Sequence, residues 1–385
     1  MQQHSQVHLS SKLPRSGTTI FSVMSQLAAD YGALNLSQGF PDFAADPWLI
    51  ELVLKYMREG ANQYAPASGM APLRELIAQL RKQAHGCFYS PEKEVNVTAG
   101  ATQAIATVIS ASIREGDEVI IFTPAYDCYA PYVELNGGIP VYVQLEFPHY
   151  RIDWQQVKKL LNHRTRMIII NTPHNPSATV LSKEDLDQLE EITSGSNLLI
   201  LSDEVYEHIV FDGARHLSVC ERPELFKRSF VVGSFGKTLH VTGWKVGYCL
   251  APEILMKEFR KIHQFMVFSV NTPVQLALAE YLSQEGATRI SGMYQEKRDF
   301  FLSSLQGSRF KPLTSMGSYF QLLDYSELSD QPDVEYAWQL TIEQGVAAIP
   351  LSVFYNQPTD HKVLRFCFAK KEETLHEAGL RLAKL

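Results

Sequence analysis

Short runs of consecutive apolar, often β-branched residues recur through the middle of the chain, and amphipathic stretches separate several of them. Consecutive apolar positions are typical of strands that are covered on both faces. Helical patterns occur at Thr102–Ile113 and at Ser182–Thr193, where Ser182 and Asp185 make a start that resembles a capping box. This alternation predicts an α/β domain with a mostly parallel sheet flanked by helices. The expected strands are Glu94–Thr98, Glu118–Phe122, Met167–Asn171, Leu198–Ser202, Ser229–Gly233 and Val246–Ala251.

The length of 385 residues is more than one compact core usually organises. We expect a large domain over residues 48–283, a smaller α+β domain from residues 13–47 and 284–385, and an N-terminal tail of residues 1–12. Residues 272–305 have the pattern of a long, charged helix that leads from the large domain into the small one. Residues 13–47 are expected to contain no long helix and to pack with the C-terminal part. That part is expected to hold strands near Tyr319–Asp324 and Val363–Phe368 and a final helix over Lys371–Lys384.

Composition and charge exclude several classes of protein. The net charge is -7 and there is no basic stripe, so we expect no nucleic acid as a partner. No apolar run approaches the roughly 18 residues that cross a bilayer, and the first residues lack the apolar stretch of a secretory signal. We therefore expect no membrane association and a cytoplasmic location. The five cysteines form no CxxC pair, which favours reduced thiols, and without HExxH or clustered carboxylates we expect no metal.

Polar residues follow three of the expected strands directly. Asn175 lies in the turn after the third strand, Asp203 and Tyr206 follow the fourth, and Lys237 follows the fifth. In open α/β sheets ligands bind at these carboxyl ends. A lysine there can become a nucleophile if its pKa is lowered. Taken singly, each residue has an ordinary explanation, because the acid could cap a helix and the lysine could be a solvated surface residue.

Two further strand ends complete the pattern. Gly100, Ala101 and Thr102 form a turn of small residues from the first strand into a helix, and backbone N–H groups at such a helix start suit a phosphate. Tyr126 follows the second strand and presents an aromatic ring. An amine, a carboxylate, a phosphate cradle and an aromatic ring at one edge of a sheet are what pyridoxal 5′-phosphate (PLP) needs.

The sequence resembles the class I aminotransferases of the fold-type-I PLP superfamily over essentially its whole length. Within them it is most similar to the methionine, kynurenine and glutamine aminotransferase branch. The stretches that carry the resemblance, in shared order, are LNLSQGFPDF, NQYAPASGMAPLR, VTAGATQAI, NTPHNPSAT, LSDEVYEHIVFDG, GSFGKTLHVTGWKVGY and VLRFCFAK. The resemblance implies a PLP enzyme that moves amino groups between amino acids and 2-oxo acids by a ping-pong mechanism.

The resemblance also implies the roles of the residues at the strand ends. Lys237 would bond covalently to the aldehyde of PLP and, once substrate displaces it, would move a proton between substrate and cofactor. Asp203 would pair with the ring nitrogen, since a nearby carboxylate keeps that nitrogen protonated. Asn175 and Tyr206 would hydrogen-bond the 3-oxygen of the ring, and Tyr126 would stack on its face.

The phosphate of the cofactor would be held, on the same grounds, by backbone and side-chain donors together. These are the turn at Gly100, the backbone of Ala101 and Thr102, the Ser234 hydroxyl, the Lys245 ammonium and Tyr64 of the neighbouring subunit. A tyrosine reaching across in this way implies a homodimer with active sites at the interface. Most class I members carry arginine where this chain has Lys245, and lysine fits the kynurenine and glutamine branch. The usual Asn-Pro-Thr-Gly is here Asn175-Pro176-Ser177-Ala178, which suggests a turn without a positive φ at residue 178.

The substrate would be gripped by its α-carboxylate. Arg365 is a single arginine in an apolar strand, where a charge is costly unless it is paired, and the resemblance pairs its planar fork with this carboxylate. Gly39 would add its backbone N–H. Phe21, Tyr126 and Phe354 are expected near the substrate side chain, and no second arginine is evident for a distal carboxylate.

This apolar surrounding favours sulfur-containing and aromatic amino acids over aspartate. Methionine is the preferred donor, because a thioether packs well on aromatic rings. Glutamine, histidine and kynurenine remain open. The sequence hardly distinguishes such an aminotransferase from one alternative enzyme, a cysteine-conjugate C–S β-lyase with the same cofactor and fold.

Overall fold

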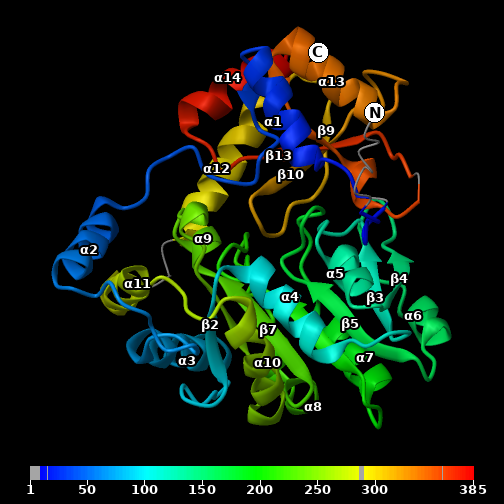
Figure 1. Cartoon of the computed structure of the whole chain (residues 1–385). Coiled ribbons are helices and arrows are strands. Elements are labelled where there is room, and N and C mark those ends of the chain that lie inside the picture. The colour runs from blue at the N-terminus through cyan, green and yellow to red at the C-terminus, as the bar shows by residue number, and fades with distance from the viewer. Residues whose placement is uncertain (1–8, 15, 286–289, 358) are drawn as a thin grey trace, which may run out of the picture.

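The computed structural model describes residues 9–14, 16–285, 290–357 and 359–385. Figure 1 shows a wide sheet in cyan and green, with helices around it, and a smaller assembly in orange and red above it. The blue helix α1 (Ile20–Asp30), near the start of the chain, lies in the upper assembly beside the C-terminal elements. The first eight residues of the predicted tail lie outside the described residues, and the domain bounds stay a prediction.

The large sheet has seven strands in the order β2-β8-β7-β6-β5-β3-β4. All neighbouring pairs from β7 to β4 are parallel, and β8 runs antiparallel to both of its neighbours. The mostly parallel sheet predicted from the sequence is therefore confirmed. The strands are β2 (Val95–Thr98), β3 (Glu118–Thr123), β4 (Ile139–Gln144), β5 (Thr165–Asn171), β6 (Leu199–Asp203), β7 (Ser229–Ser234) and β8 (Gly247–Leu250).

The apolar runs of the sequence are central strands because each consecutive side chain enters a core. Ile168 and Ile170 of β5 belong to one cluster of buried hydrophobic residues, and Met167 and Ile169 belong to a second cluster. Successive side chains of a strand point to opposite faces, so both faces of the sheet are covered. The edge strand β4 was not predicted, because it contains a proline and most of its residues are half buried or exposed.

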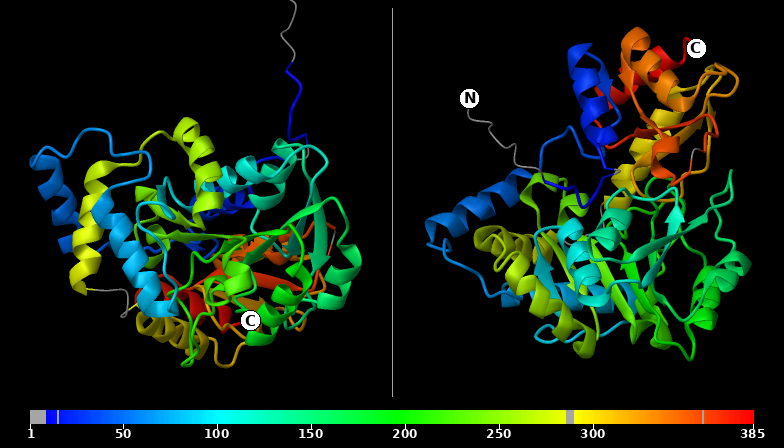
Figure 2. Two further views of the ribbon diagram at one scale, coloured as in Figure 1. Left: turned by 90° about the horizontal axis from the view of Figure 1, so that it is seen from below. Right: turned by 45° about the vertical axis from the view of Figure 1, so that its right-hand side comes forward.

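The helices of the large domain surround this sheet. The predicted capping box of α7 is present, with Ser182 and Asp185 exchanging hydrogen bonds. Figure 2 shows from two further sides that α2 and α11 lie together at one end of the molecule. The helices are α2 (Pro47–Arg58), α3 (Ala71–His85), α4 (Ala101–Ser112), α5 (Tyr129–Leu135), α6 (Trp154–Leu160), α7 (Lys183–Thr193), α8 (Pro223–Phe226), α9 (Phe235–Thr238), α10 (Glu253–Met266) and α11 (Thr272–Glu285), with 3-10 turns η1 (Val219–Glu221) and η2 (Thr242–Trp244).

The smaller assembly is built on an antiparallel sheet of order β12-β13-β10-β9. A two-stranded parallel sheet joins β1 to β11, pairing Leu34 with Val346, so the N-terminal segment packs with the C-terminal part as expected. Its elements are β1 (Leu34–Asn35), α12 (Ile290–Ser304), β9 (Lys311–Pro312), β10 (Phe320–Asp324), α13 (Asp333–Gln344), β11 (Val346–Ala347), β12 (Ile349–Pro350), η3 (Leu351–Phe354), β13 (Val363–Cys367) and α14 (Glu372–Leu382).

One expectation about helices needs correction. Residues 13–47 do contain a helix of three turns, α1, which Thr19 caps and which buries Met24 and Ala28 four residues apart. Because only a narrow stripe of this helix is buried, its sequence carries a weak helical pattern of apolar residues. The helices α11 and α12 both lie within the long helix expected over residues 272–305, and residues 286–289 between them lie outside the described residues.

Two structural findings concern membrane-spanning helices and the cysteines. No helix in the described ranges is long and apolar enough to cross a membrane. All five cysteines are free thiols, and all but Cys128 are buried, as the sequence suggested.

Candidate active site

A pocket of about 200 Å³ lies where the carboxyl ends of the central strands meet the smaller assembly. Most residues predicted for the site line it, although they come from positions as far apart as 21 and 365. They are Phe21, Gly39, Gly100, Ala101, Thr102, Tyr126, Asn175, Asp203, Tyr206, Ser234, Lys237, Lys245 and Arg365.

Two predicted residues do not line this pocket. The side chain of Tyr64 is 81% exposed and meets only the ring of Phe268 edge-on among the ring contacts of the described residues. Phe354 is buried behind the pocket wall, with its ring 5.1 Å from the Arg365 guanidinium and 6.0 Å from the ring of Phe21. It can therefore shape the pocket through these two residues.

Lys237 stands just past the end of β7, in the short helix α9. Its Nζ donates to the hydroxyl of Tyr319 at 2.8 Å and to the carbonyl of Gly39 at 3.2 Å. Burial lowers the pKa of Lys237 from 10.5 to about 8, and the nearby charges of Arg365 and Lys245 act in the same direction. An amine with this pKa is neutral in about a tenth of the molecules at pH 7, a far larger fraction than for a free lysine, and the neutral form can act as a nucleophile.

Asp203 is the last residue of β6 and is buried at the base of the pocket. One carboxylate oxygen accepts a hydrogen bond from the hydroxyl of Tyr129 at 2.6 Å, and the other accepts one from the backbone N–H of Val205 at 3.3 Å. Burial raises the pKa of Asp203 to about 6, while the two hydrogen bonds favour the ionised form. No described cation forms an ion pair with this carboxylate, although Lys237 attracts it without direct contact, so a cationic ligand atom close to it would stabilise it.

Asn175 connects the base of the pocket with the smaller assembly. Its backbone N–H donates to the side-chain oxygen of Asn171 at 2.8 Å, and its own side-chain oxygen accepts from Nη1 of Arg365 at 2.6 Å.

The turn that follows Asn175 corrects an expectation, because Ala178 has a φ of 60°. Its N–H donates to the carbonyl of His174, and its own carbonyl accepts from the N–H groups of Met316 and Gly317. These bonds hold the left-handed conformation without a glycine.

Arg365 is buried on β13 and is held by uncharged groups. Nη1 donates to Asn175, Nη2 donates to the carbonyl of Ser37 at 3.1 Å, and Nε has no partner among the described residues. The guanidinium lies 4.0 Å from the ring centre of Phe320. Burial lowers the pKa of Arg365 to about 10. A buried cation without a carboxylate partner is costly, so this geometry suits an anionic ligand.

The opposite end of the pocket gathers donors for a second anion. Helix α4 begins at Ala101, and Gly100 before it has a φ of 80° and provides no side-chain cap, which leaves the first N–H groups of α4 open to a ligand. A Cβ at Gly100 would lie 3.2 Å from Nζ of Lys245. A Cβ at Gly247 would lie 2.7 Å from the carbonyl of Gly233 and 3.0 Å from the N of Ala101. Glycine at 247 thus allows α4 to approach the sheet closely.

Sequence reasoning missed four residues that contact the predicted ones. Tyr129 donates a hydrogen bond to Asp203, and Asn171 accepts one from the backbone of Asn175. Tyr319 accepts one from Lys237, and Gln38 lines the pocket next to Gly39. Asn171 carried a usable signal, because it is the last residue of an expected strand. Tyr129 and Tyr319 carried none that separates them from ordinary packing aromatics, since their partners are distant in sequence.

Comparison with known proteins identifies the family. A sequence model of the family described as "Aminotransferase class I and II" matches residues 31–382. The methionine aminotransferase of Escherichia coli (strain K12) is 50% identical over 97% of this chain and 98% of its own. Kynurenine–oxoglutarate transaminase 1 of Mus musculus is 34% identical over 93% of each chain.

Solved structures agree with the sequence comparison. A structure from Escherichia coli, for which a methionine aminotransferase function is described, superposes with a TM-score of 0.97 at 50% identity and covers 99% of this chain and all of that one. The N-succinyldiaminopimelate aminotransferase of Mycobacterium tuberculosis superposes with a TM-score of 0.94 at 37% identity, over 98% of this chain and all of that one. The family and its fold are PLP-dependent. With this fold, this pocket and a match over nearly its whole length, the chain belongs to the class I and II aminotransferases.

Proposed function

We propose that this aminotransferase holds PLP covalently through Lys237 and takes its amino group from methionine and related sulfur-containing or aromatic amino acids. The observation that carries the proposal is the pocket itself. It brings together an amine with a lowered pKa, Lys237, a buried carboxylate, Asp203, and a buried guanidinium, Arg365, and neither of the last two forms an ion pair with another described residue.

The residues present fit this cofactor from end to end. The open N–H groups at the start of α4, the Ser234 hydroxyl and the Lys245 ammonium suit the phosphate. The carboxylate of Asp203 suits a protonated ring nitrogen, which would supply its missing cation. Tyr206 and Asn175 line the pocket between these ends and can donate to the 3-oxygen, and Tyr126 offers a ring face.

The chemistry is then divided between the cofactor and the chain. When bound, PLP supplies an aldehyde that bonds to amines and a ring that withdraws electrons from the α-carbon of the substrate. Lys237 in its neutral form would act as the nucleophile, and after the substrate has replaced it, the same Nζ would take the proton from Cα and deliver it to the cofactor. Asp203 in its ionised form would pair with the ring nitrogen, and Arg365 would fix the α-carboxylate, so that the Cα–H bond could be presented to the lysine.

The choice of donor rests on what surrounds the substrate side chain. The pocket is lined by the rings of Phe21, Tyr126 and Phe320, and Phe354 supports Phe21 and Arg365 from behind. Lys237, Lys245 and Arg365 are the cations among the described lining residues, and each is assigned to another part of the reaction. A distal carboxylate, as in aspartate, would therefore be buried unpaired. The relatives named for methionine and kynurenine support the same choice.

A panel of amino acids tests this proposal. The protein saturated with PLP is mixed with methionine, phenylalanine, kynurenine or aspartate in single turnover, and the change in cofactor absorbance is followed. We expect fast conversion with methionine and the aromatic donors, slow conversion with aspartate, and parallel double-reciprocal plots with a 2-oxo acid, as a ping-pong mechanism requires. Fast conversion with aspartate alone contradicts the specificity. Pyruvate release from a cysteine conjugate without any 2-oxo acid, faster than transamination, favours the β-lyase alternative.

We also propose that the enzyme is a homodimer in which Tyr64 completes the phosphate site of the partner subunit. Tyr64, Phe265 and Phe268 are large apolar side chains that are 81%, 87% and 57% exposed in the single chain, which is unusual unless another surface covers them. Co-expression of Tyr64→Ala and Lys237→Ala chains tests this, because a mixed dimer would contain one site with both wild-type residues. Recovery of activity beyond that of either variant supports the proposal, and a monomer in sedimentation contradicts it. A cytoplasmic location stays a prediction.

A further inference from the structure

The amine of Lys237 is held by two acceptors of different kinds. One is the carbonyl of Gly39, at 3.2 Å, and the other is the hydroxyl of Tyr319, at 2.8 Å. Tyr319 in turn donates its proton to the same Gly39 carbonyl. Its hydroxyl therefore has only lone pairs to offer the lysine, so the amine is the donor in this contact. Lys237, Tyr319 and Gly39 form a closed triangle of hydrogen bonds at the junction of the large sheet and the smaller assembly.

This arrangement fixes the direction of the lone pair on Nζ. A neutral primary amine has two N–H bonds and one lone pair. When both N–H bonds are given to Gly39 and Tyr319, the lone pair is the one position on nitrogen that is left for reaction. Tyr319 cannot compete for that lone pair, because its own proton is committed to Gly39. Such an amine is oriented as a base before the substrate proton arrives.

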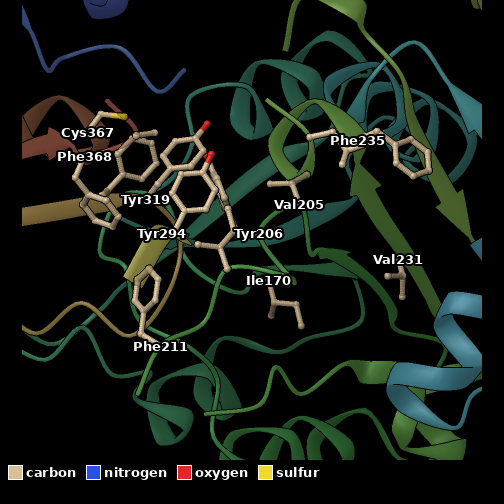
Figure 3. Packing of buried hydrophobic residues seen from close by; sticks show 14 of the residues in the cluster. Ile170, Val205, Tyr206, Phe211, Val231, Phe235, Tyr294, Tyr319, Cys367 and Phe368 are labelled. Carbon is tan, nitrogen blue, oxygen red and sulfur yellow. The ribbon is translucent and has the colours of Figure 1, made fainter. Parts of the chain in front are cut away.

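The ring of Tyr319 is rigidly packed, as an orienting group must be. Its side chain is fully buried, and its ring centre lies 5.1 Å from that of Tyr206, 5.0 Å from that of Phe320 and 5.7 Å from that of Tyr294. Figure 3 shows Tyr206, Tyr294 and Tyr319 gathered in one group of rings. The hydroxyl of Tyr319 therefore has little freedom to leave the lysine.

We propose that Tyr319 is a further catalytic residue of amino transfer: it receives the amine of Lys237 each time substrate displaces that amine from the cofactor, and it holds the lone pair ready for the Cα proton. The proposal rests on the proposed function. The substrate Cα–H bond breaks, its electron pair is taken up by the cofactor ring, and a new N–H bond forms on Nζ. The resulting ammonium then gives a proton to the cofactor carbon that had carried the aldehyde, and the neutral amine is restored.

Two variants separate this role from simple packing. Tyr319→Phe keeps the ring and removes the hydroxyl. Tyr294→Phe is the matched control, because Tyr294 is also fully buried and adjacent, but its hydroxyl bonds to Nδ1 of His240 at 2.9 Å and not to Lys237. Both variants are purified with PLP bound, and their folding is compared by circular dichroism.

The first measurement is the single-turnover rate with methionine and with methionine deuterated at Cα. For Tyr319→Phe we expect a rate about 10- to 100-fold lower and a larger deuterium isotope effect, because proton transfer becomes slower than the other steps. The methionine concentration that gives half the maximal rate should change less than about threefold. Tyr294→Phe should stay within about twofold of wild type in all three quantities.

The second measurement needs no turnover. In protein loaded with pyridoxamine phosphate the amine of Lys237 is free, and its pKa is obtained from the pH dependence of competitive acetylation, read by peptide mass spectrometry. An acceptor stabilises the ammonium form, so Tyr319→Phe should lower the pKa of Lys237 and Tyr294→Phe should leave it unchanged.

The proposal requires that Tyr319→Phe lower both the single-turnover rate and the pKa of Lys237. An unchanged pKa or an unchanged rate in Tyr319→Phe overturns the proposal, and so do equal losses in the control. If no amino acid converts the wild-type protein, the proposed function fails, and the labelling measurement still decides whether Tyr319 holds the amine.

Discussion

Replacing Asp203 with asparagine should make the cofactor-free protein more stable while it destroys the activity. The side chain of Asp203 is 3% exposed, and both oxygens already accept a hydrogen bond, from Tyr129 and from the backbone of Val205. In asparagine the oxygen can still accept from Val205 and the amide group can donate to the oxygen of Tyr129, but the hydroxyl proton of Tyr129 loses the acceptor that Asp203 provides. The substitution therefore removes the buried charge and sacrifices one hydrogen bond, which is worth about 1 kcal/mol.

The size of the effect follows from the pKa of this carboxyl. Burial raises the pKa of Asp203 from 3.8 to about 6, and a tenfold change in an acid constant corresponds to about 1.4 kcal/mol, so the ionised form costs the folded state about 3 kcal/mol. Because the pKa is raised on folding, the stability that protonation provides is fully present below pH 3.8 and is lost as the pH rises through about 6. After about 1 kcal/mol is subtracted for the lost hydrogen bond, the gain from Asp203→Asn should be about 2 kcal/mol at pH 8 and should turn into a small loss near pH 4.

The assay is urea unfolding of both proteins, stripped of cofactor, at pH 4.5, 6 and 8. With cofactor bound, the order of stability should reverse, since only the carboxylate can pair with the protonated ring nitrogen. Loss of that charged hydrogen bond, worth about 3 kcal/mol, should lower kcat by at least about 100-fold. A cofactor-free Asp203→Asn protein that is no more stable than wild type at pH 8 refutes the reasoning about the buried charge. A fully active one refutes the role of Asp203 as partner of the ring nitrogen.

Three other substitutions test the supporting residues. Tyr129→Phe removes a donor that favours the ionised form of Asp203, so its pKa should rise and the acid limb of the pH profile of kcat/KM should move to higher pH; an unmoved limb contradicts this. Arg365→Lys keeps the charge but loses the fork, and the KM for methionine should rise about 10- to 100-fold with a smaller change in kcat, whereas an unchanged KM would place the carboxylate elsewhere. Gly247→Ala puts a methyl group against Gly233 and Ala101, so dialysis should strip PLP from it faster than from wild type, and equal retention would show that the start of α4 does not hold the phosphate.

The sequence predicted the central sheet well because burial on both faces leaves a clear local signal. Each of the six expected strands coincides with an observed one to within about two residues at either end. The edge strand β4 and the helix α1 lack such a signal, since β4 is half exposed and α1 buries only a narrow stripe. The turn at Ala178 was misjudged because long-range bonds from Met316 and Gly317, and not the residue type, fix its backbone.

The candidate site likewise contains residues that the sequence identified and residues that only the folded structure reveals. Residues that end a strand, such as Asp203 and Lys237, could be recognised from the chain alone, because position after an apolar run places them at the ligand-binding edge. Tyr129 and Tyr319 could not, since they act on those residues across 74 and 82 positions of sequence, and only the folded structure brings them into contact. Their hydroxyls tune the groups that the sequence had already identified.

The central claim is that the amine of Lys237 bonds to the aldehyde of PLP. Purified protein supplied with PLP is reduced with borohydride, digested and analysed by mass spectrometry. We expect a phosphopyridoxyl group on the peptide that carries Lys237, and we expect Lys237→Ala to abolish it. An unmodified Lys237, or a group found instead on Lys245 in the wild-type protein, would contradict this claim.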